Sequence, residues 1–293
     1  MSTYSNKKEF KDLSLLDAFL FALATENPEN AKLIAKIVIR RVFGWQVADI
    51  QVEMEKQYLG TRVGGKGIRL DLQVTEINQG KAVRLYDIEP NAYEEQYLEK
   101  RSRYYLSLTD VKHLGTSKKY KEFSDYFSVW ILPYDPFGDN RMVYTVKNMV
   151  VENPDLVYNE GVTRVFLYTD GELGGTEEIQ SLLKYMEDSN ESNAVDSELK
   201  EIHSVVSRIK SDEEAGEHYM TWDDVIEYEK RDSFEAGHEA GLEEGLQAGM
   251  ETGINNFIAA CRKMNQSDND IINLLMDEFS LTKEIAIAKV TNN

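Results

Sequence analysis

The chain has 293 residues, of which 42% are hydrophobic and 29% are charged, as in folded globular proteins rather than disordered ones. Its single cysteine, Cys261, excludes an intrachain disulfide and a cysteine-based zinc cluster, and it favours a reducing, cytoplasmic compartment. The most apolar stretch, Leu13–Ala24, is too short to span a bilayer, so we expect no membrane partner.

The net charge of −19 is unevenly distributed. Residues 1–150 carry 22 Lys or Arg and 20 Asp or Glu, whereas residues 151–293 carry 11 and 32. The acidity therefore belongs to the second half of the chain. The nearly neutral first half stays compatible with DNA as a partner, because local rather than net charge governs such binding.

Hydrophobic periodicity predicts a mixed α/β fold in the middle of the chain, followed by an acidic all-helical C-terminal region. In chain order we expect two helices, three strands, a helix and three more strands: Leu13–Leu23, Ala31–Val42, Gln46–Tyr58, Ile68–Ile77, Ala82–Ile88, Tyr93–Leu108, Phe127–Leu132, Met142–Val150 and Arg164–Tyr168. From Glu177 the pattern is helical. The predicted regions are an α/β domain (1–175), an acidic helical region (176–234), a glycine-repeat helix (235–254) and a small helical segment (255–293).

Glycine recurs at every fourth position late in the chain, at Gly237, Gly241, Gly245, Gly249 and Gly253. This spacing places small residues on one helix face and allows another helix to approach closely. We therefore predict a helix that forms a homo-oligomer or docks on a partner. A flexible acidic linker is the alternative, since each glycine costs a helix about 0.8–1 kcal/mol relative to alanine.

The hairpin over residues 68–91 carries most of the polar signal. Strand alternation puts Arg69, Asp71 and Gln73 on one face of the first strand, and Asp87, Glu89 and Asn91 on one face of the second. A three-residue loop, 78–80, pairs Ile77 with Lys81 and sets Asp71 opposite Asp87. A two-residue loop instead sets Asp71 opposite Ile88 and turns Glu89 to the other face.

In the first register, three carboxylates converge. Clustered carboxylates repel unless they are protonated, solvated or bridged by a cation, and oxygen ligands without nearby His or Cys favour Mg²⁺ or Mn²⁺. The alternative is a half-exposed hairpin whose polar face meets only solvent.

The motifs Gly67-Ile68-Arg69-Leu70-Asp71 and Tyr86-Asp87-Ile88-Glu89-Pro90-Asn91 resemble the core of the PD-(D/E)XK nucleases. Together with three further stretches, they resemble the transposase-like Rpn branch of recombination-promoting nucleases over roughly residues 13–253: Lys100-Arg101-Ser102-Arg103-Tyr104-Tyr105, Asp135-Pro136-Phe137-Gly138 and Val165-Phe166-Leu167-Tyr168-Thr169-Asp170-Gly171. The resemblance implies a restriction-endonuclease-like core, in which helices flank a mixed central sheet. It also implies a Mg²⁺-dependent endonuclease that hydrolyses phosphodiester bonds in DNA.

The resemblance also implies roles for individual residues. Asp71 and Glu89 are the expected metal ligands, with Asp87 and Asp17 as weaker candidates, and Asn91 stands where the family has a lysine or glutamine that assists catalysis. An asparagine keeps hydrogen bonding but carries no charge. The alternative for Asp17 is an ordinary charge on a helix surface.

Three arginines are candidates for DNA contacts: Arg69, Arg101 and Arg103. The forked guanidinium donors suit phosphate, although Arg101 has a salt bridge to a nearby glutamate as its alternative. The functional alternatives to a nuclease are a non-catalytic nucleic-acid-binding or regulatory protein that keeps this fold, and an assembly module that acts through the C-terminal helix.

Overall fold

The computed structural model describes residues 8–58, 68–114 and 119–291. Its helices and strands are, in chain order, α1 (Ala18–Glu26), α2 (Pro28–Phe43), β1 (Ile50–Tyr58), β2 (Ile68–Asn78), β3 (Lys81–Pro90), α3 (Leu98–Leu114), β4 (Asp125–Leu132), β5 (Val143–Val146), β6 (Val162–Tyr168), α4 (Glu177–Glu187), α5 (Ser197–Lys210), α6 (Glu213–Lys263), α7 (Asp268–Phe279) and α8 (Lys283–Thr291). Short 3-10 helices lie at η1 (Phe10–Asp12), η2 (Tyr120–Glu122) and η3 (Glu191–Asn193).

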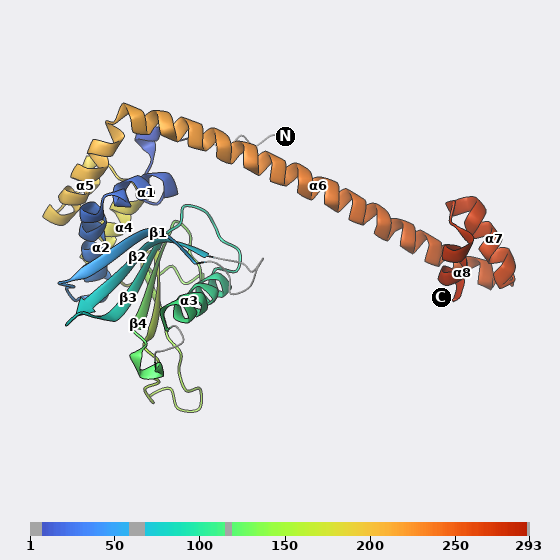
Figure 1. The fold of residues 1–293 in the computed structure, drawn as a ribbon, viewed down its shortest axis with the longest axis horizontal. Coiled ribbons are helices and arrows are strands. Elements are labelled where there is room, and N and C mark those ends of the chain that lie inside the picture. The colour runs from blue at the N-terminus through green and yellow to red at the C-terminus, as the bar shows by residue number, and fades with distance from the viewer. Residues whose placement is uncertain (1–7, 59–67, 115–118, 292–293) are drawn as a thin grey trace. The chain divides into compact units, whose positions relative to one another are not determined.

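The chain divides into two compact units, residues 1–220 and 221–293. The first unit is built on a six-stranded mixed sheet with the order β1-β2-β3-β4-β6-β5. Figure 1 shows β1 to β4 side by side in this sheet. β1, β2 and β3 form an antiparallel meander, β3, β4 and β6 run parallel, and β5 is antiparallel at the edge. The predicted α/β fold with a mixed sheet, flanking helices and C-terminal helices is confirmed at this level.

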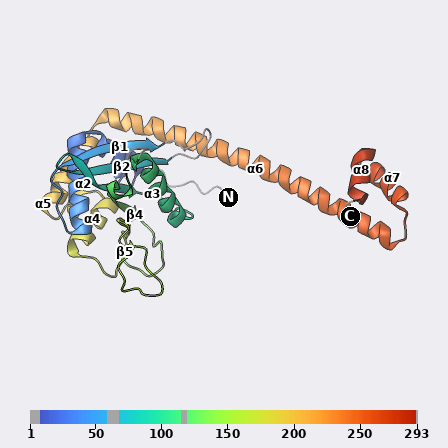
Figure 2. The ribbon, with the colours of Figure 1, turned by 60° about the horizontal axis from the view of Figure 1, so that its bottom comes forward.

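Helices cover both faces of the sheet (Figures 1 and 2). One core joins side chains of α1, α2, α4 and α5 to one sheet face, where Leu72, Ile88 and Val129 are buried. A second core joins α3 to the opposite face through Tyr105 and Trp130. Because the parallel strands are covered on both sides, they are almost continuously apolar, as the buried run of β4 shows.

The hairpin has the two-residue loop that was the alternative for the sequence, but at the carboxylates its register differs from both alternatives. Asn78 pairs with Lys81 across a two-residue turn, in which Gln79 and Gly80 have φ angles of 51° and 75°. Positive φ at both central residues is the requirement of a type I′ turn, whose twist matches that of the strands. A register shift between Glu76 and Ile77 then adds one more residue of displacement.

The combined displacement is two residues from the three-residue-loop register, so the pairing of Asp71 with Asp87 was wrong. Gln73 lies opposite Asp87 instead. Because side chains alternate with a period of two, an even displacement keeps the polar sets of both strands on the same face. The carboxylates therefore meet even though the expected register does not form.

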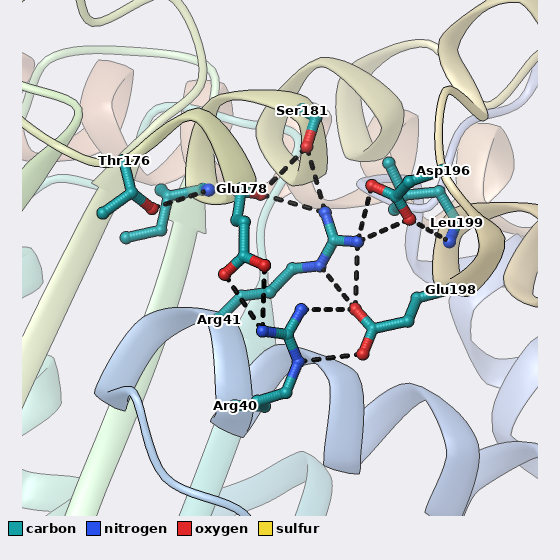
Figure 3. Close-up of polar contacts among 9 residues, drawn as sticks. Arg40, Arg41, Thr176, Glu178, Ser181, Asp196, Glu198 and Leu199 are labelled. Carbon is teal, nitrogen blue, oxygen red and sulfur yellow. Dashed lines mark hydrogen bonds and ion pairs between the residues drawn. The ribbon is translucent and has the colours of Figure 1, made fainter.

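An ion network fixes α4 and α5 to α2 (Figure 3). The side chain of Arg41 is 1% exposed, and it donates to both carboxylate oxygens of Asp196 at 2.7 and 2.8 Å, to the backbone oxygen of Glu178 and to Oγ of Ser181. Arg40 and Arg41 share the carboxylate of Glu198. The first compact unit therefore extends past residue 175, the boundary expected from composition.

The second unit contains the rest of α6 with α7 and α8, around a small core of Ile254, Ile258, Cys261, Ile271 and Leu275. The glycine-repeat segment is helical within α6, as predicted. An added Cβ at Gly241, Gly245 or Gly249 meets no atom within 4 Å among the residues described. In the part of the chain that the structure describes, no helix combines the length and hydrophobicity needed to cross a membrane.

Candidate functional site

Asp71, Asp87 and Glu89 lie together on the sheet face that α3 covers. The backbone N–H of Asp71 donates to Oε1 of Glu89 at 2.9 Å, and the hydroxyl of Tyr126 on β4 donates to Oδ2 of Asp87 at 3.1 Å. Asp87 is 0% exposed and Glu89 is 2% exposed, while Asp71 is half-buried. The three side chains form a buried cluster, here called the carboxylate cluster, with Asp71 at its more open side.

Burial raises the pKa of each member of the carboxylate cluster. It raises the pKa of Asp71 to about 6, against the opposing charges of Arg69 and Arg101. It raises the pKa of Asp87 to about 7. Burial, and then the negative charges of Asp87 and Asp71, raise the pKa of Glu89 well above its usual range. The cluster therefore holds protons near neutral pH unless another cation compensates its charge.

A row of polar residues crosses the middle of this face at one level of the sheet. Gln73 on β2, Asp87 on β3, Ser128 on β4 and Arg164 on β6 are successive cross-strand partners. Four of their buried atoms have no hydrogen-bond partner among the described residues: Gln73 Nε2, Asp87 Oδ1, Ser128 Oγ and Arg164 Nε. Native interiors leave few polar atoms in this state, and a catalytic role or a bound ion is one explanation for them.

Arg101 of α3 lies near the carboxylate cluster, on the sheet face that α3 covers. Its guanidinium lies 5.3 Å from the ring centre of Trp130, and its Nε and Nη2 donate to the hydroxyl of Tyr105 at 3.1 and 2.8 Å. It also forms the ion pair that the sequence allowed, to Glu95 at 2.6 Å. Its positive charge acts on the pKa values of both Asp71 and Asp87. Arg101 is thus a partly buried cation next to buried carboxylates.

A pocket of about 750 Å³ opens beside the cluster, between α3 and the ends of β1 and β2. Four tyrosines and three cationic side chains contribute to its lining: Tyr58, Tyr97, Tyr104, Tyr105, Arg69, Lys100 and Arg101. The hydroxyl of Tyr58 donates to Oε1 of Gln73 at 2.8 Å, which links the wall of the pocket to the polar row. We call this feature the tyrosine pocket.

The remaining arginine candidates have different environments. Arg69 is exposed at the pocket wall and forms a 3.5 Å ion pair with Glu55. Glu55 has a φ of 46° inside β1, and it interrupts regular pairing between Met54 and Lys56. Arg103 is exposed on α3 and does not line the pocket.

The β1 irregularity also breaks the simple alternation expected for β2. Leu72 contributes to the core beneath α1 and α2, whereas Leu70 contributes to the core beneath α3. A strict period of two would put both on one face. Asp71 lies between Leu70 and Leu72, where the buried side chains of β2 pass from one core to the other.

Asn91 and Asp17 lie outside the described contacts of the carboxylate cluster. Oδ1 of Asn91 accepts from the backbone N–H of Tyr93 at 3.0 Å, in a turn just after β3. The Asp17 carboxylate accepts from Ser14 and Lys8 at the start of α1, on the opposite side of the sheet. The structure thus brings Asp71, Asp87 and Glu89 together and does not bring Asp17 to them.

Sequence reasoning missed several residues of this site. Gln73 was recognised as sharing the polar face, but its buried pairing with Asp87 was not expected. Ser128 lies within the predicted strand Phe127–Leu132, an apolar run that indicates only a buried strand, and Tyr126 directly precedes it. Both residues are an even number of positions from Trp130 and therefore share its face of β4. This shared face was the only sign in the sequence that they could reach the site. Which strand neighbours β3 is decided by the topology, so that signal could not be used.

Carboxylate oxygens of this kind suit a hard divalent cation. Among the described residues, however, no three His, Cys, Asp or Glu side chains are arranged as a ready metal site. The cluster combines hydrogen-bond acceptors, carboxyl groups that stay protonated near neutral pH and a neighbouring guanidinium. Such groups serve in acid–base chemistry and in phosphate binding.

No family model, curated protein or solved structure matches this chain.

Proposed function

We propose that this protein is a metal-dependent endonuclease of the PD-(D/E)XK, Rpn-like type, which hydrolyses phosphodiester bonds in DNA at the carboxylate cluster. The observation that carries the proposal is the convergence of Asp71, Asp87 and Glu89 on one buried sheet face beneath Arg101. The order of strands, a three-stranded antiparallel meander continued by parallel strands with a helix between β3 and β4, is consistent with a core of this type.

The residues present fit Mg²⁺ or Mn²⁺ by their chemistry. Asp71 and Glu89 would hold the ion, with Asp87 behind them, because Oδ1 of Asp87 is a buried acceptor without a described hydrogen-bond partner. Burying unpaired carboxylates is costly, and a divalent cation offsets that cost. When bound, such an ion polarises a phosphoryl oxygen and lowers the pKa of water.

The other residues act on the substrate and on protons. Arg101 offers a guanidinium to a phosphate and is held in place by Tyr105 and Glu95. Tyr126 orients Asp87 through its hydroxyl. Without a bound ion, burial raises the pKa of Asp87 to about 7, so this carboxyl takes up a proton near neutral pH. Arg69 adds exposed positive charge at the edge of the site.

The second candidate is a nucleic-acid-binding or regulatory protein without catalysis. The turn at Asn91 favours it, because the side-chain oxygen already accepts from Tyr93 and no charge stands at this position. In that case the cluster binds an ion or protons and does not turn over substrate. As a nucleic-acid-binding protein, this second candidate shares DNA as its partner with the proposed nuclease and differs from it in not hydrolysing the DNA.

Cleavage of supercoiled plasmid with Mg²⁺, Mn²⁺ or Ca²⁺ tests the proposal. The wild type is compared with Asp71→Asn and Glu89→Gln, which keep the shape of the side chains and remove charge. Glu29→Gln is the matched control, since Glu29 is an exposed glutamate on α2. We expect Mg²⁺-dependent cleavage by the wild type and the control, and at least a hundredfold loss in the two cluster variants.

Equal activity in wild type and Glu89→Gln would show that cutting comes from elsewhere, and would overturn the proposal. Metal binding and DNA binding without cleavage under any of the three ions would favour the non-catalytic candidate. Titration calorimetry with Mg²⁺ on the same proteins separates loss of the ion from loss of chemistry.

A further inference from the structure

The tyrosine pocket lies directly beside the carboxylate cluster but contains none of its members. Its floor is formed by Tyr58 and Tyr105, each 7% exposed, and its rim by Tyr97 and Tyr104, which are 68% and 38% exposed. A volume of about 750 Å³ is within the range of pockets that enclose small organic groups. Large exposed aromatic side chains at such a rim call for an explanation.

Three cationic side chains line the pocket together with these tyrosine rings. Arg69, Lys100 and Arg101 line the pocket against one acidic residue, Glu95, whose carboxylate is engaged by Arg101 at 2.6 Å. The ammonium of Lys100 lies 4.8 Å from the ring centre of Tyr97. The lining therefore offers flat aromatic surface and positive charge together, which is the combination that takes a nucleobase and its phosphate.

Tyr97 is held at the rim by an unusual backbone. Its φ is 62°, and its carbonyl accepts from the backbone N–H groups of Lys100 and Arg101 at the start of α3. The left-handed conformation costs a residue with a side chain roughly 1–2 kcal/mol, so tyrosine is a poor choice for the turn alone. A role of the tyrosine ring in contacting a ligand explains why tyrosine occupies position 97.

We propose that the tyrosine pocket takes one unpaired nucleotide of the DNA substrate, with its base stacked against Tyr97 and Tyr104 and its phosphates facing Arg69 and Lys100. This inference rests on the proposed function and names its substrate class. Bases in a duplex are already stacked and paired, so the pocket accepts single-stranded or unpaired DNA and disfavours an intact duplex.

The test is binding of a fluorescent single-stranded oligonucleotide and of its duplex, measured by anisotropy with Ca²⁺ in place of Mg²⁺. Backbone charge attracts both forms and favours the more highly charged duplex, so a preference for the single strand reports a contribution of the bases. We expect the wild type to favour the single strand by about tenfold, and Tyr97→Ala or Tyr104→Ala to lower single-strand affinity by about fivefold or more.

Two further variants keep the test sharp. Tyr97→Phe retains the ring and should retain the preference, and Tyr120→Ala removes an 84% exposed tyrosine outside the pocket and should leave it unchanged. Circular dichroism and melting temperature verify that each variant is folded. Equal affinity of the wild type for single strand and duplex, or equal loss for both in Tyr97→Ala, overturns the inference.

Failure of this inference is distinguishable from failure of the proposed function. Plasmid cleavage that depends on Glu89, with no single-strand preference, overturns the pocket assignment and leaves the nuclease proposal intact. A preference that depends on Tyr97, without cleavage of either the plasmid or the single-stranded oligonucleotide under any divalent ion, supports the pocket and counts against catalysis.

Discussion

The backbone N–H of Asp71 donates a 2.9 Å hydrogen bond to the side chain of Glu89, which links two proposed metal ligands across neighbouring strands. A strand N–H that bonds to a carboxylate fixes that carboxylate beside its partner. The bond also stabilises the charged form of Glu89, against burial and two negative neighbours that favour its protonation. This single contact couples the local structure of β2 to the electrostatics of the cluster.

The contact predicts different outcomes for two substitutions of Glu89. Glu89→Gln keeps an oxygen acceptor for Asp71, so we expect stability close to wild type but Mg²⁺ affinity reduced at least tenfold. Glu89→Ala also removes the acceptor and leaves a buried N–H, which costs about 1–3 kcal/mol of unfolding free energy. Titration calorimetry and urea denaturation measure the two effects. Equal stability of both variants would contradict the role of this hydrogen bond.

The raised pKa values predict how stability depends on pH without divalent ions. Asp71 and Asp87 titrate near 3.8 when unfolded but at about 6 and about 7 when folded, so the folded state binds more protons between these values. Their contribution to stability therefore decreases as pH rises through this window. Asp87→Asn should flatten the decrease in melting temperature between about pH 5 and about pH 8, and saturating Mg²⁺ should do the same in wild type.

The control for this measurement is Asp139→Asn, which neutralises an exposed carboxylate outside the cluster. Its pH profile should follow that of the wild type. A wild-type melting temperature that rises steadily from pH 5 to pH 8 in chelator, with the same slope in Asp87→Asn, would mean that the cluster is not the source of the dependence.

If the protein cleaves DNA, Asn91→Ala separates a catalytic role from a structural one. The side chain is not among the carboxylates, so we expect Mg²⁺ affinity to be unchanged and kcat to fall about tenfold or more through loss of hydrogen bonding at the reacting water. The lost turn to Tyr93 should cost about 1 kcal/mol of stability. Unchanged kcat with that stability loss would assign Asn91 to the turn alone.

The Arg40–Arg41 network predicts unequal costs for two similar substitutions. Arg41→Met removes a guanidinium that is 1% exposed, with its two bonds to Asp196 and its bond to Glu198, whereas Glu198 keeps its bonds from Arg40. We therefore expect a loss of about 2–3 kcal/mol of unfolding free energy. Arg40→Met acts on a side chain that is 24% exposed, and its ion pairs are screened by solvent, so its cost should be about 1 kcal/mol. Urea denaturation measures both, and equal losses would contradict the role given to burial.

The open space around the glycine stripe of α6 predicts that alanine stabilises the helix. Gly241, Gly245 and Gly249 have no atom within 4 Å of an added Cβ, so the triple alanine variant should be stabler by about 2–3 kcal/mol in helix formation. Circular dichroism melting measures this gain, and light scattering gives the association state. Dissociation of an oligomer in the variant, instead of a gain in melting temperature, would support the proposed homo-oligomer, because close helix approach needs glycine.

The sequence by itself determined the elements and the polar face. Alternation along residues 85–91 is a local property of the strand, and it places Asp87 and Glu89 on one polar face. Along β2 the same period predicts Asp71 beside Gln73, but Leu70 and Leu72 enter different cores, so alternation alone did not decide the position of Asp71. The helical period likewise predicts α2 and a helical region from Glu177, in which α4 and α5 form with buried apolar faces. Boundaries were less certain, and α3 begins at Leu98 rather than Tyr93 because the turns at Asn91 and Tyr97 precede it.

The tertiary structure decided the rest. The hairpin register depends on a positive φ at Gln79 and on a shift beside Glu76, which are energetic choices between turns that spacing leaves open. Only the order of strands brings Ser128 and Tyr126 to the cluster. Only the packing of α3 puts Arg101 above it, and burial raises the carboxylate pKa values, because desolvation is a property of the whole surroundings and not of the residue.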